Sequence, residues 1–311
     1  KVIEEEIRIQ AEMAYKIKCE LEKPKEKHEC RLKANCGYLL QKVDWPEYHI
    51  GSLPRISKGK FWSMFDNGIL DIKDITDLSI LTKGQKPYYE SYVNERLIIK
   101  ETKIKELLNT LIFPLYFLDY ETYAPGVPFI KDYGIYEKIP FQFSLHILDS
   151  PNSDLRHEEF LLEDLSRQEV LINELKNHIK ETGNIIAWNK SFEASCNDIL
   201  AQKFPYYKRF LSVLNERLFD LEDFFKFNYY VDYRFKGKSS IKYVLPVLVP
   251  EMKYENLAIN EGQLASYRWK KAFVDEHPKY PKDKTRKELL EYCEQDSLAM
   301  VKIYEFLKSK V

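Results

Sequence analysis

The sequence predicts an α/β domain over residues 112–311, preceded by a smaller, mainly helical region that bears cysteines. Three observations predict this class. Short apolar runs typical of buried strands alternate with longer amphipathic segments typical of helices. The composition, 44% hydrophobic and 31% charged over 311 residues, is that of a folded globular protein. The 10 glycines beside 22 tyrosines and 18 phenylalanines favour a helix-rich mixed fold over an all-β fold.

The region before residue 112 divides into residues 1–50 and 51–111. Apolar residues recur at helical intervals over 2–17, and a cysteine-bearing loop follows. FWSMFDNGILDIKDIT (61–76) then predicts a helix, a turn at Asn67–Gly68 and a short second helix near Asp71. This segment resembles the helix–hairpin–helix modules that grip the DNA backbone, although such turns are also common packing devices. Further helices are expected over about 85–94 and 101–111.

The elements of the α/β domain follow from its hydrophobic pattern. Compact apolar runs predict strands over 114–122, 141–148 and 185–188. Amphipathic segments predict helices over 163–182, 191–204, 206–227, from Ser240 onward and over 285–309. Gly183 is expected at the C-terminal end of the first of these helices, where a left-handed residue is favoured.

Charge and cysteine usage restrict the class of protein. The formal net charge is −1, which argues against a protein that coats nucleic acid through bulk charge but allows a local basic groove. No run approaches the ~20 apolar residues of a membrane helix, and no secretory signal opens the chain. Five cysteines, an odd number, suit a reducing cytoplasm rather than a disulfide scaffold.

An acidic pair lies on the first strand of the α/β domain. Asp119 and Glu121 are two residues apart, so both carboxylates project from one face of the strand. Two acids on an apolar strand are costly to bury unless a cation compensates them, and hard oxygen ligands suit Mg²⁺ or Mn²⁺. Two surface acids at a strand end would give the same pattern.

Two later segments carry further polar residues. AWNKSFEASCNDIL runs from a strand into a helix that bears Asn189, Phe192 and Glu193. In EYCEQDSLAMV, Tyr292 and Asp296 are four residues apart and therefore lie on one helix face. Each segment alone is weak evidence, and their order along the chain is the stronger signal.

This ordered set resembles the DnaQ-like exonucleases of the DEDD class, in the version with tyrosine in the third motif. FLDYET matches the first motif, WNKSFE the second and YCEQD the third, over about residues 112–305. Glu291 stands where the histidine version would place its base, which supports the tyrosine type. The second motif usually ends in aspartate, whereas here the position is Glu193. Asp198, on the same predicted helix, is an alternative ligand.

The resemblance implies a ribonuclease H-like fold and a two-metal 3′–5′ exonuclease. Asp119, Glu121, Glu193 and Asp296 would hold two Mg²⁺ or Mn²⁺ ions around the scissile phosphate. Tyr292 would orient or help to deprotonate the attacking water. The products would be nucleoside 5′-monophosphates released from single-stranded DNA.

A single strand would be held by aromatic side chains that stack on bases and basic ones that pair with phosphates. YYVDYRFKGKSSIK offers both immediately before a helix N-terminus, and YRWKKAF with KYPKDKTRK is a second such stretch. Each could equally be a solvated surface with its aromatics turned inward. Asn189 could contact the terminal sugar or merely cap its helix. The candidate substrate residues are Thr122, Asn189, Phe192, Arg234, Lys236, Lys238 and Ser240.

Three further cysteines, Cys19, Cys30 and Cys36, lie in the N-terminal loop. They suit zinc, with His28 as a fourth ligand, or an iron–sulfur cluster whose fourth cysteine lies upstream. HECRLKANC resembles the cysteine-bearing tail of RecB-like nucleases, which implies such a nuclease upstream in the same polypeptide. Three unligated thiols are the simpler alternative. Cys196 and Cys293 are expected to be small core residues.

The sequence leaves three other functions open. An exonuclease that acts on RNA or oligonucleotides has the same motifs, because recognition of a 2′-hydroxyl depends on geometry. A catalytically inactive nucleic-acid-binding module is suggested by Glu193 in place of aspartate. An unrelated α/β domain with coincidental acids is the third.

Overall fold

The computed structural model describes residues 43–252, 254 and 257–311. They form two compact units, with the boundary between Tyr89 and Glu90. The helix expected over 2–17 and the cysteine loop with Cys19, Cys30 and Cys36 lie outside the described residues.

The smaller unit is built from short helices. Helix α3 (Lys58–Asp66) begins after Ser57, whose side-chain oxygen accepts a hydrogen bond from Lys60 N, and it ends at Asn67. Gly68 then adopts a φ of +77°, which a glycine tolerates without strain. The predicted helix and turn are therefore confirmed, while the second helix is a single 3₁₀ turn, η3 (Ile72–Asp74). The other elements are η2 (Ile50–Ser52) and η4 (Leu78–Ile80), and helix α4 (Lys86–Val93) contains the boundary between the two units.

The larger unit contains a mixed five-stranded sheet, which confirms the predicted α/β class. The strands are β2 (Leu115–Tyr123), β3 (Ile139–Leu148), β4 (Leu155–Leu161), β5 (Asn184–Ala187) and β6 (Leu218–Asp220). Their order across the sheet is β4-β3-β2-β5-β6. Strands β2, β5 and β6 are parallel, and β3 is antiparallel to both β2 and β4. The carboxyl ends of β2, β5 and β6 therefore meet at one edge of the sheet.

Two edge strands were not expected from the sequence. Strand β4 was missed because LRHEEFL is mostly polar, and an edge strand with partly exposed faces lacks the apolar run of a central one. Strand β6 lies inside the segment predicted to be helical over 206–227, so that prediction was wrong there. Leu218, Phe219 and Asp220 are too few to show a period of two, and they become a strand by pairing with β5.

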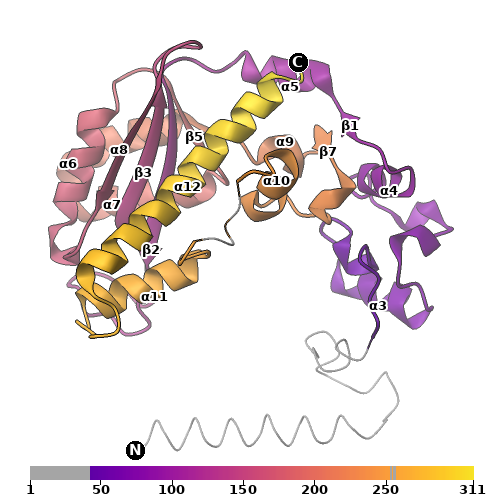
Figure 1. Cartoon of the computed structure of the whole chain (residues 1–311), viewed down its shortest axis with the longest axis horizontal. Coiled ribbons are helices and arrows are strands. Elements are labelled where there is room, and N and C mark those ends of the chain that lie inside the picture. Colours follow the sequence, from indigo (N-terminus) through magenta and orange to yellow (C-terminus); the bar gives the residue numbers. More distant parts are fainter. Residues whose placement is uncertain (1–42, 253, 255–256) are drawn as a thin grey trace, which may run out of the picture. The chain divides into compact units, whose positions relative to one another are not determined.

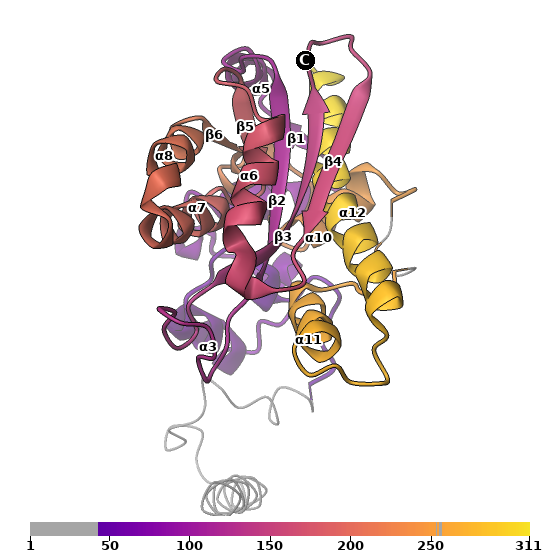
Figure 2. The ribbon, with the colours of Figure 1, turned by 90° about the vertical axis from the view of Figure 1, so that its left-hand side faces the viewer.

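Helices cover both faces of the sheet, as Figures 1 and 2 show. Helices α6, α7 and α8 lie on one face and α11 and α12 on the other. Their bounds are α6 (Gln168–His178), α7 (Ser191–Lys203), α8 (Lys208–Glu216), α9 (Asp223–Lys226), α10 (Ile241–Leu248), α11 (Gly262–Phe273) and α12 (Lys282–Lys308). Short 3₁₀ turns connect some of them: η5 (Leu165–Arg167), η6 (Pro205–Tyr207) and η7 (Tyr233–Phe235).

Two helix predictions need correction, and one helix was missed. Helix α6 ends at His178, so Gly183 is not its C-terminal residue. Gly183 has a φ of +95°, and a Cβ there would lie 2.1 Å from the carbonyl oxygen of Pro114, so the close approach of two backbones requires glycine. Helix α12 begins at Lys282 rather than Thr285, which is buried inside it. Helix α11 was not predicted as a helix.

The larger unit begins before residue 112, where the composition changes. Strand β1 (Ile98–Ile99) pairs with β7 (Tyr230–Val231). Helix α5 (Glu101–Leu108) buries Ile104 in the same core as the central strands. The segment expected to be a linker is thus part of this unit.

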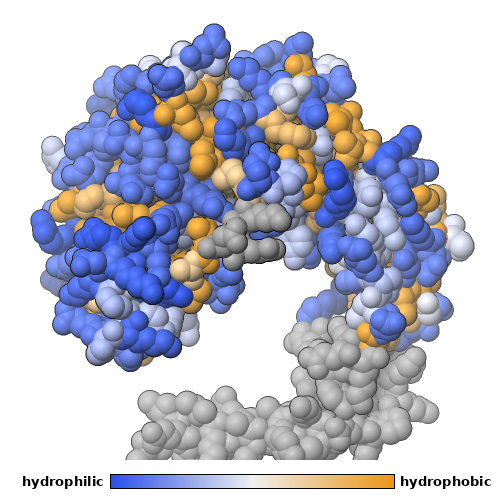
Figure 3. Space-filling view, viewed as in Figure 1, coloured by the Kyte–Doolittle hydropathy of each residue, from blue (hydrophilic) through white to orange (hydrophobic). Residues whose placement is uncertain are grey.

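The surface of the larger unit is mostly hydrophilic on the side drawn in Figure 3, with apolar residues scattered between polar ones. Helix α12 carries ion pairs along its exposed face, including Lys284–Glu288 and Lys287–Glu291. Within the part of the chain that the structure describes, no helix is both long and apolar enough to cross a membrane.

Candidate functional site

Strand β2 carries Asp119 and Glu121 at the centre of the sheet, near its carboxyl end. Both lie on the face that α12 covers, and Tyr120 between them points the other way, where its hydroxyl donates to Asn197 of α7. A shift in the pairing with β3 follows Glu121. Such irregularities bend a strand locally and commonly adjoin functional sites.

Helix α12 brings the third motif to the same place. One ligand oxygen from each of Asp119, Glu121 and Asp296 lies within 4.8 Å of the others. Tyr292, one helical turn before Asp296, is 3% exposed. The Sγ of Cys293 lies 3.3 Å from Asp119 Oδ2, so this cysteine contacts the cluster and is more than a small core residue.

Glu193 comes from the first turn of α7, and its carboxylate interacts electrostatically with that of Asp119. It is 2% exposed, and its Oε2 has no hydrogen-bond partner among the described residues. A buried carboxylate oxygen without a partner is costly, and a cation would satisfy it. Asp198, the alternative ligand, is exposed and accepts a hydrogen bond from Asn215. Glu193, and not Asp198, is therefore the acid of α7 that interacts with Asp119, although it is not among the three acids whose ligand oxygens lie within 4.8 Å of one another.

Burial raises the pKa of all four carboxyl groups of the site. Burial is the largest cause for each, and the neighbouring carboxylates raise the pKa of Asp119, Glu121 and Glu193 further. The pKa of Asp296 rises to about 6 through burial, opposed by a hydrogen bond from Tyr254. Because these four carboxyl groups resist ionisation when they lie together, divalent cations can readily replace their protons.

Sequence reasoning missed two residues that face the cluster. Tyr254 is buried, donates a hydrogen bond to Asp296 Oδ1 and has its ring 6.4 Å from that of Tyr292. Lys242, in the first turn of α10, places its Nζ 5.6 Å from the centre of each tyrosine ring. Its charge lowers the pKa of three of the carboxyl groups. Lys242 is the last residue of the basic stretch YYVDYRFKGKSSIK but was not singled out within it, and Tyr254 stands at no motif spacing.

The loop between β5 and α7 is fixed by Asp220 at the end of β6. Its carboxylate accepts hydrogen bonds from the backbone N–H of Asn189 and of Lys190 at 3.0 and 3.2 Å. Asn189 has a φ of +62°, and its Oδ1 accepts from the Ser191 hydroxyl at 2.5 Å. Asn189 therefore does not cap α7 through its side chain, and its exposed amide remains a candidate for contact with a ligand.

Two of the expected substrate residues lie near the cluster. Phe192 is half-buried against the core, and the Nζ of Lys138 lies 4.4 Å from the centre of its ring. Lys138 also lowers the pKa of Glu193. Sequence reasoning did not identify this lysine. Thr122 follows the acidic pair directly, and its carbonyl accepts a hydrogen bond from Ser266 of α11.

The basic residues expected to hold phosphates are arranged differently. Arg234 is committed to the buried Asp232 through its Nε and Nη2, at 2.9 and 2.5 Å from carboxylate oxygens. Lys236 ends η7 with a left-handed backbone, and Lys238 and Ser240 are exposed. Ser240 precedes α10, but its side chain makes no capping hydrogen bond.

The second basic stretch is largely paired internally. Lys270 and Lys271 both bind Asp275, and Lys282 binds Glu276. These ion pairs lower the positive charge available to a nucleic acid on this surface.

The fold and the site define an α/β domain with a buried acidic cluster at the carboxyl ends of its parallel strands. Residues 116–240 match the family described as "Domain of unknown function (DUF2779)". Asp119, Glu121 and Glu193 lie within the matched segment, and Asp296 lies beyond it.

The chain is also similar to curated proteins of mycoplasmas. It is 26% identical over 246 residues to the uncharacterized protein MG366 of Mycoplasma genitalium, a match that covers 72% of this chain and 36% of that protein. It is 22% identical over 263 residues to the uncharacterized protein UU173 of Ureaplasma parvum, covering 77% of this chain and 38% of that protein. The chain thus spans little more than a third of the length of these relatives. No solved structure matches it.

Proposed function

We propose that this chain contains a metal-dependent 3′–5′ exonuclease domain of the ribonuclease H-like fold, similar to the tyrosine-type DnaQ-like enzymes, which acts on single-stranded DNA. The observation that carries the proposal is the convergence of Asp119, Glu121 and Asp296, with ligand oxygens within 4.8 Å of one another. The strand order β4-β3-β2-β5-β6, in which only β3 runs against the others, supports the assignment of the fold.

The donor set fits two Mg²⁺ or Mn²⁺ ions. All four side chains offer carboxylate oxygens, the ligands that these hard cations prefer, and Glu193 Oε2 is a buried oxygen without a partner among the described residues. When bound, the ions would supply an acidified water and charge stabilisation for the leaving 3′ oxygen. Asp119, Glu121, Glu193 and Asp296 would hold them.

The neighbouring residues have roles that follow from their positions. Tyr292 would orient the attacking water, since burial and the carboxylates around it raise the pKa of its phenol and keep it protonated at neutral pH. Tyr254 would hold Asp296 through its hydrogen bond. Lys242 would pair with a phosphate oxygen of the bound strand, because its Nζ lies close to both tyrosine rings and to the carboxylates.

The proposal includes two elements that rest on sequence resemblance alone. One is a RecB-like nuclease upstream in the same polypeptide, and the other is an iron–sulfur cluster or zinc at Cys19, Cys30 and Cys36, which lie outside the described residues. The preference for DNA over RNA also belongs to the proposal.

The test is a nuclease assay on 3′- and 5′-labelled single strands of DNA and RNA, in Mn²⁺, Mg²⁺ and EDTA. We expect stepwise shortening from the 3′ end, abolished by EDTA and by Asp119→Asn. Asp198→Asn is the matched control, because this exposed carboxylate contacts Asn215 and should leave activity unchanged. Cleavage of RNA alone would reassign the substrate. Activity that persists in Asp119→Asn would refute the four-carboxylate site.

A further inference from the structure

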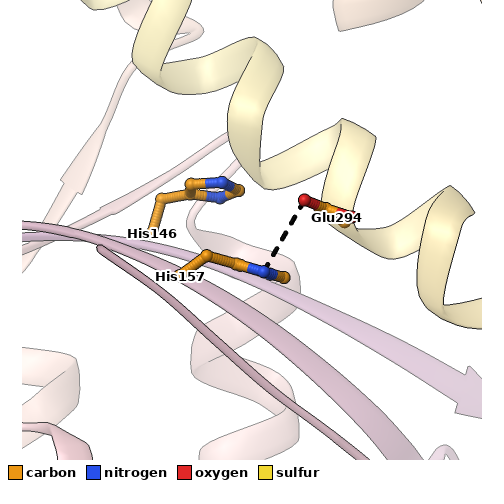
Figure 4. Close-up of side chains that lie close together, drawn as sticks. All are labelled: His146, His157 and Glu294. Carbon is orange, nitrogen blue, oxygen red and sulfur yellow. Dashed lines mark ion pairs between the residues drawn. The ribbon is translucent and has the colours of Figure 1, made fainter. Parts of the chain in front are cut away.

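A second polar cluster lies under α12, and it is made of different ligand types. His146 of β3 and His157 of β4 are direct cross-strand partners, so their side chains share one face of the sheet. Their rings stack with centroids 4.4 Å apart, and Glu294 of α12 faces them (Figure 4). Glu294 Oε1 lies 3.7 Å from His157 Nδ1, and one ligand atom from each of the three residues lies within 4.8 Å of the others.

Hydrogen bonds link both imidazoles to two buried serines. The Ser297 hydroxyl lies 2.8 Å from His146 Nδ1 and 2.7 Å from Ser144 Oγ, and Ser144 Oγ lies 2.9 Å from His157 Nε2. Each ring thus uses one nitrogen in this network, and the other nitrogen, His146 Nε2 or His157 Nδ1, is not part of it.

The second nitrogen of His157, Nδ1, faces the Glu294 carboxylate at 3.7 Å. A cation shared by this nitrogen and the carboxylate would compensate the negative charge. Within the described residues, neither Glu294 nor Glu159, the acid on the far side of His157, forms an ion pair with a lysine or arginine.

We propose that His146, His157 and Glu294 form a zinc site. Two imidazole nitrogens and one carboxylate oxygen suit Zn²⁺, which leaves a fourth position for water. The all-oxygen cluster of Asp119, Glu121 and Asp296 instead suits Mg²⁺ or Mn²⁺. Ser297 and Ser144 would act as outer partners that orient the imidazoles. Because the two rings are stacked, they would have to turn for both outer nitrogens to reach one ion.

The position of this site suggests what the ion would do. Its three ligands come from β3, β4 and α12, so a bound ion ties the helix to two strands of the sheet. Glu294 is two residues before Asp296. The zinc site would therefore fix the part of α12 that carries Asp296. The inference concerns ligation alone and does not depend on nuclease activity.

The test is titration of the metal-free full chain with Co²⁺ and Zn²⁺, followed by Co²⁺ absorption and zinc content. We expect d–d bands of a tetrahedral nitrogen and oxygen site from one equivalent of Co²⁺, displaced by Zn²⁺. His157→Gln should weaken this binding ~100-fold or more, since removal of a direct ligand exceeds the 10–100-fold typical of outer partners. Glu294→Gln should act in the same direction, and because this side chain is partly exposed it should leave the fold intact.

Two matched variants separate this site from the other metal-binding groups of the chain. Asp119→Asn should retain the nitrogen and oxygen spectrum, because it changes the carboxylate cluster only. The triple substitution Cys19→Ser, Cys30→Ser and Cys36→Ser should remove any sulfur-to-cobalt charge-transfer band and leave the d–d bands of this site. If zinc binding survives both His157→Gln and Glu294→Gln, or disappears in Asp119→Asn, the proposed zinc site is wrong.

Discussion

Glu193 stands where the resembled second motif has aspartate, and its surroundings explain how a longer side chain is accommodated. It lies in the first turn of α7. The loop that leads into this helix is held in place by its hydrogen bonds to Asp220. It is buried next to Asp119 without a partner for Oε2 in the described part of the chain. The extra methylene can thus be compensated by the position of the helix, so the substitution by itself does not imply an inactive site.

Substitution of Glu193 should show whether this carboxylate binds the metal or is only a buried side chain. We expect Glu193→Gln to lower the exonuclease rate at least ~100-fold, because a neutral amide cannot replace a charged metal ligand. Glu193→Asp should retain more activity than Glu193→Gln, since it keeps the charge and loses only reach. Rates measured at saturating Mn²⁺ check the order, and equal rates for the wild type and Glu193→Gln would exclude a role for this carboxylate.

The two tyrosines beside Asp296 are expected to differ in what they affect. Tyr292→Phe should lower kcat ~100-fold with a smaller effect on metal affinity, because its hydroxyl would orient the water. Tyr254→Phe removes a hydrogen bond to Asp296 and should weaken metal affinity ~10-fold, with a smaller loss of rate at saturating metal. Metal titrations of both variants, read by rate and by thermal shift, make the comparison. Loss of metal binding in Tyr292→Phe would show that its role is structural.

At the scale of elements, the site depends on three helices that bring side chains to the carboxyl end of β2. Helix α7 supplies Glu193, α12 supplies Tyr292 and Asp296, and α10 supplies Lys242 in its first turn. The N-terminus of α11 approaches as well, since a Cβ on Gly262 would lie 3.6 Å from Glu121 Oε2. The basic loop before α10 was expected to bind phosphate, but the lysine that reaches the carboxylates comes one turn later.

Two lysines of this segment give a direct comparison. Lys242→Gln should raise the KM for single-stranded DNA ~10-fold, since it removes a charge-assisted contact beside the reacting phosphate. Lys238→Gln should change KM much less, because Lys238 is exposed and no contact of it with the carboxylate cluster is described. Steady-state kinetics at fixed salt provide the measurement. A larger effect of Lys238→Gln would show that the phosphate is bound by the loop before α10 and not by Lys242.

For the whole molecule, the buried acids couple stability to pH and metal. The folded-state pKa of Asp296 is about 6, above its ordinary value of 3.8, and those of Asp119, Glu121 and Glu193 are also raised. A carboxyl group with a raised pKa stabilises the fold below its unfolded pKa, and this contribution is lost as the pH rises through the folded pKa. A bound cation reverses the loss, because it favours the ionised ligands.

The Tm should follow this linkage. In EDTA, the contribution of Asp296 should fall between about pH 4 and pH 6, and those of Asp119, Glu121 and Glu193 should go on falling as the pH rises through their own raised pKa values. The increase in Tm caused by Mn²⁺ should grow as the pH rises from 5 to 8. Asp296→Asn should flatten the pH dependence in EDTA and shrink the Mn²⁺ effect, as differential scanning calorimetry can show. An Mn²⁺ effect that is independent of pH would contradict the assigned ligands.

The sequence alone determined the elements whose signal is local. The apolar run of β2, the pair Asp119 and Glu121 on one of its faces, and the one-turn spacing of Tyr292 and Asp296 on α12 all follow from strand and helix periodicity. The α/β class follows from the alternation of these patterns. These features depend on residues a few positions apart, and backbone geometry alone relates such residues.

Tertiary structure decided the features that depend on distant pairing. Strands β4 and β6 exist because β3 and β5 offer edges to pair with, and neither has a hydrophobic period of its own. Tyr254 and Lys242 reach Asp296 across 42 and 54 positions of sequence, and His146 meets Glu294 only because α12 crosses β3. Local pattern carries no information on such contacts, because they are set by how helices and strands pack together.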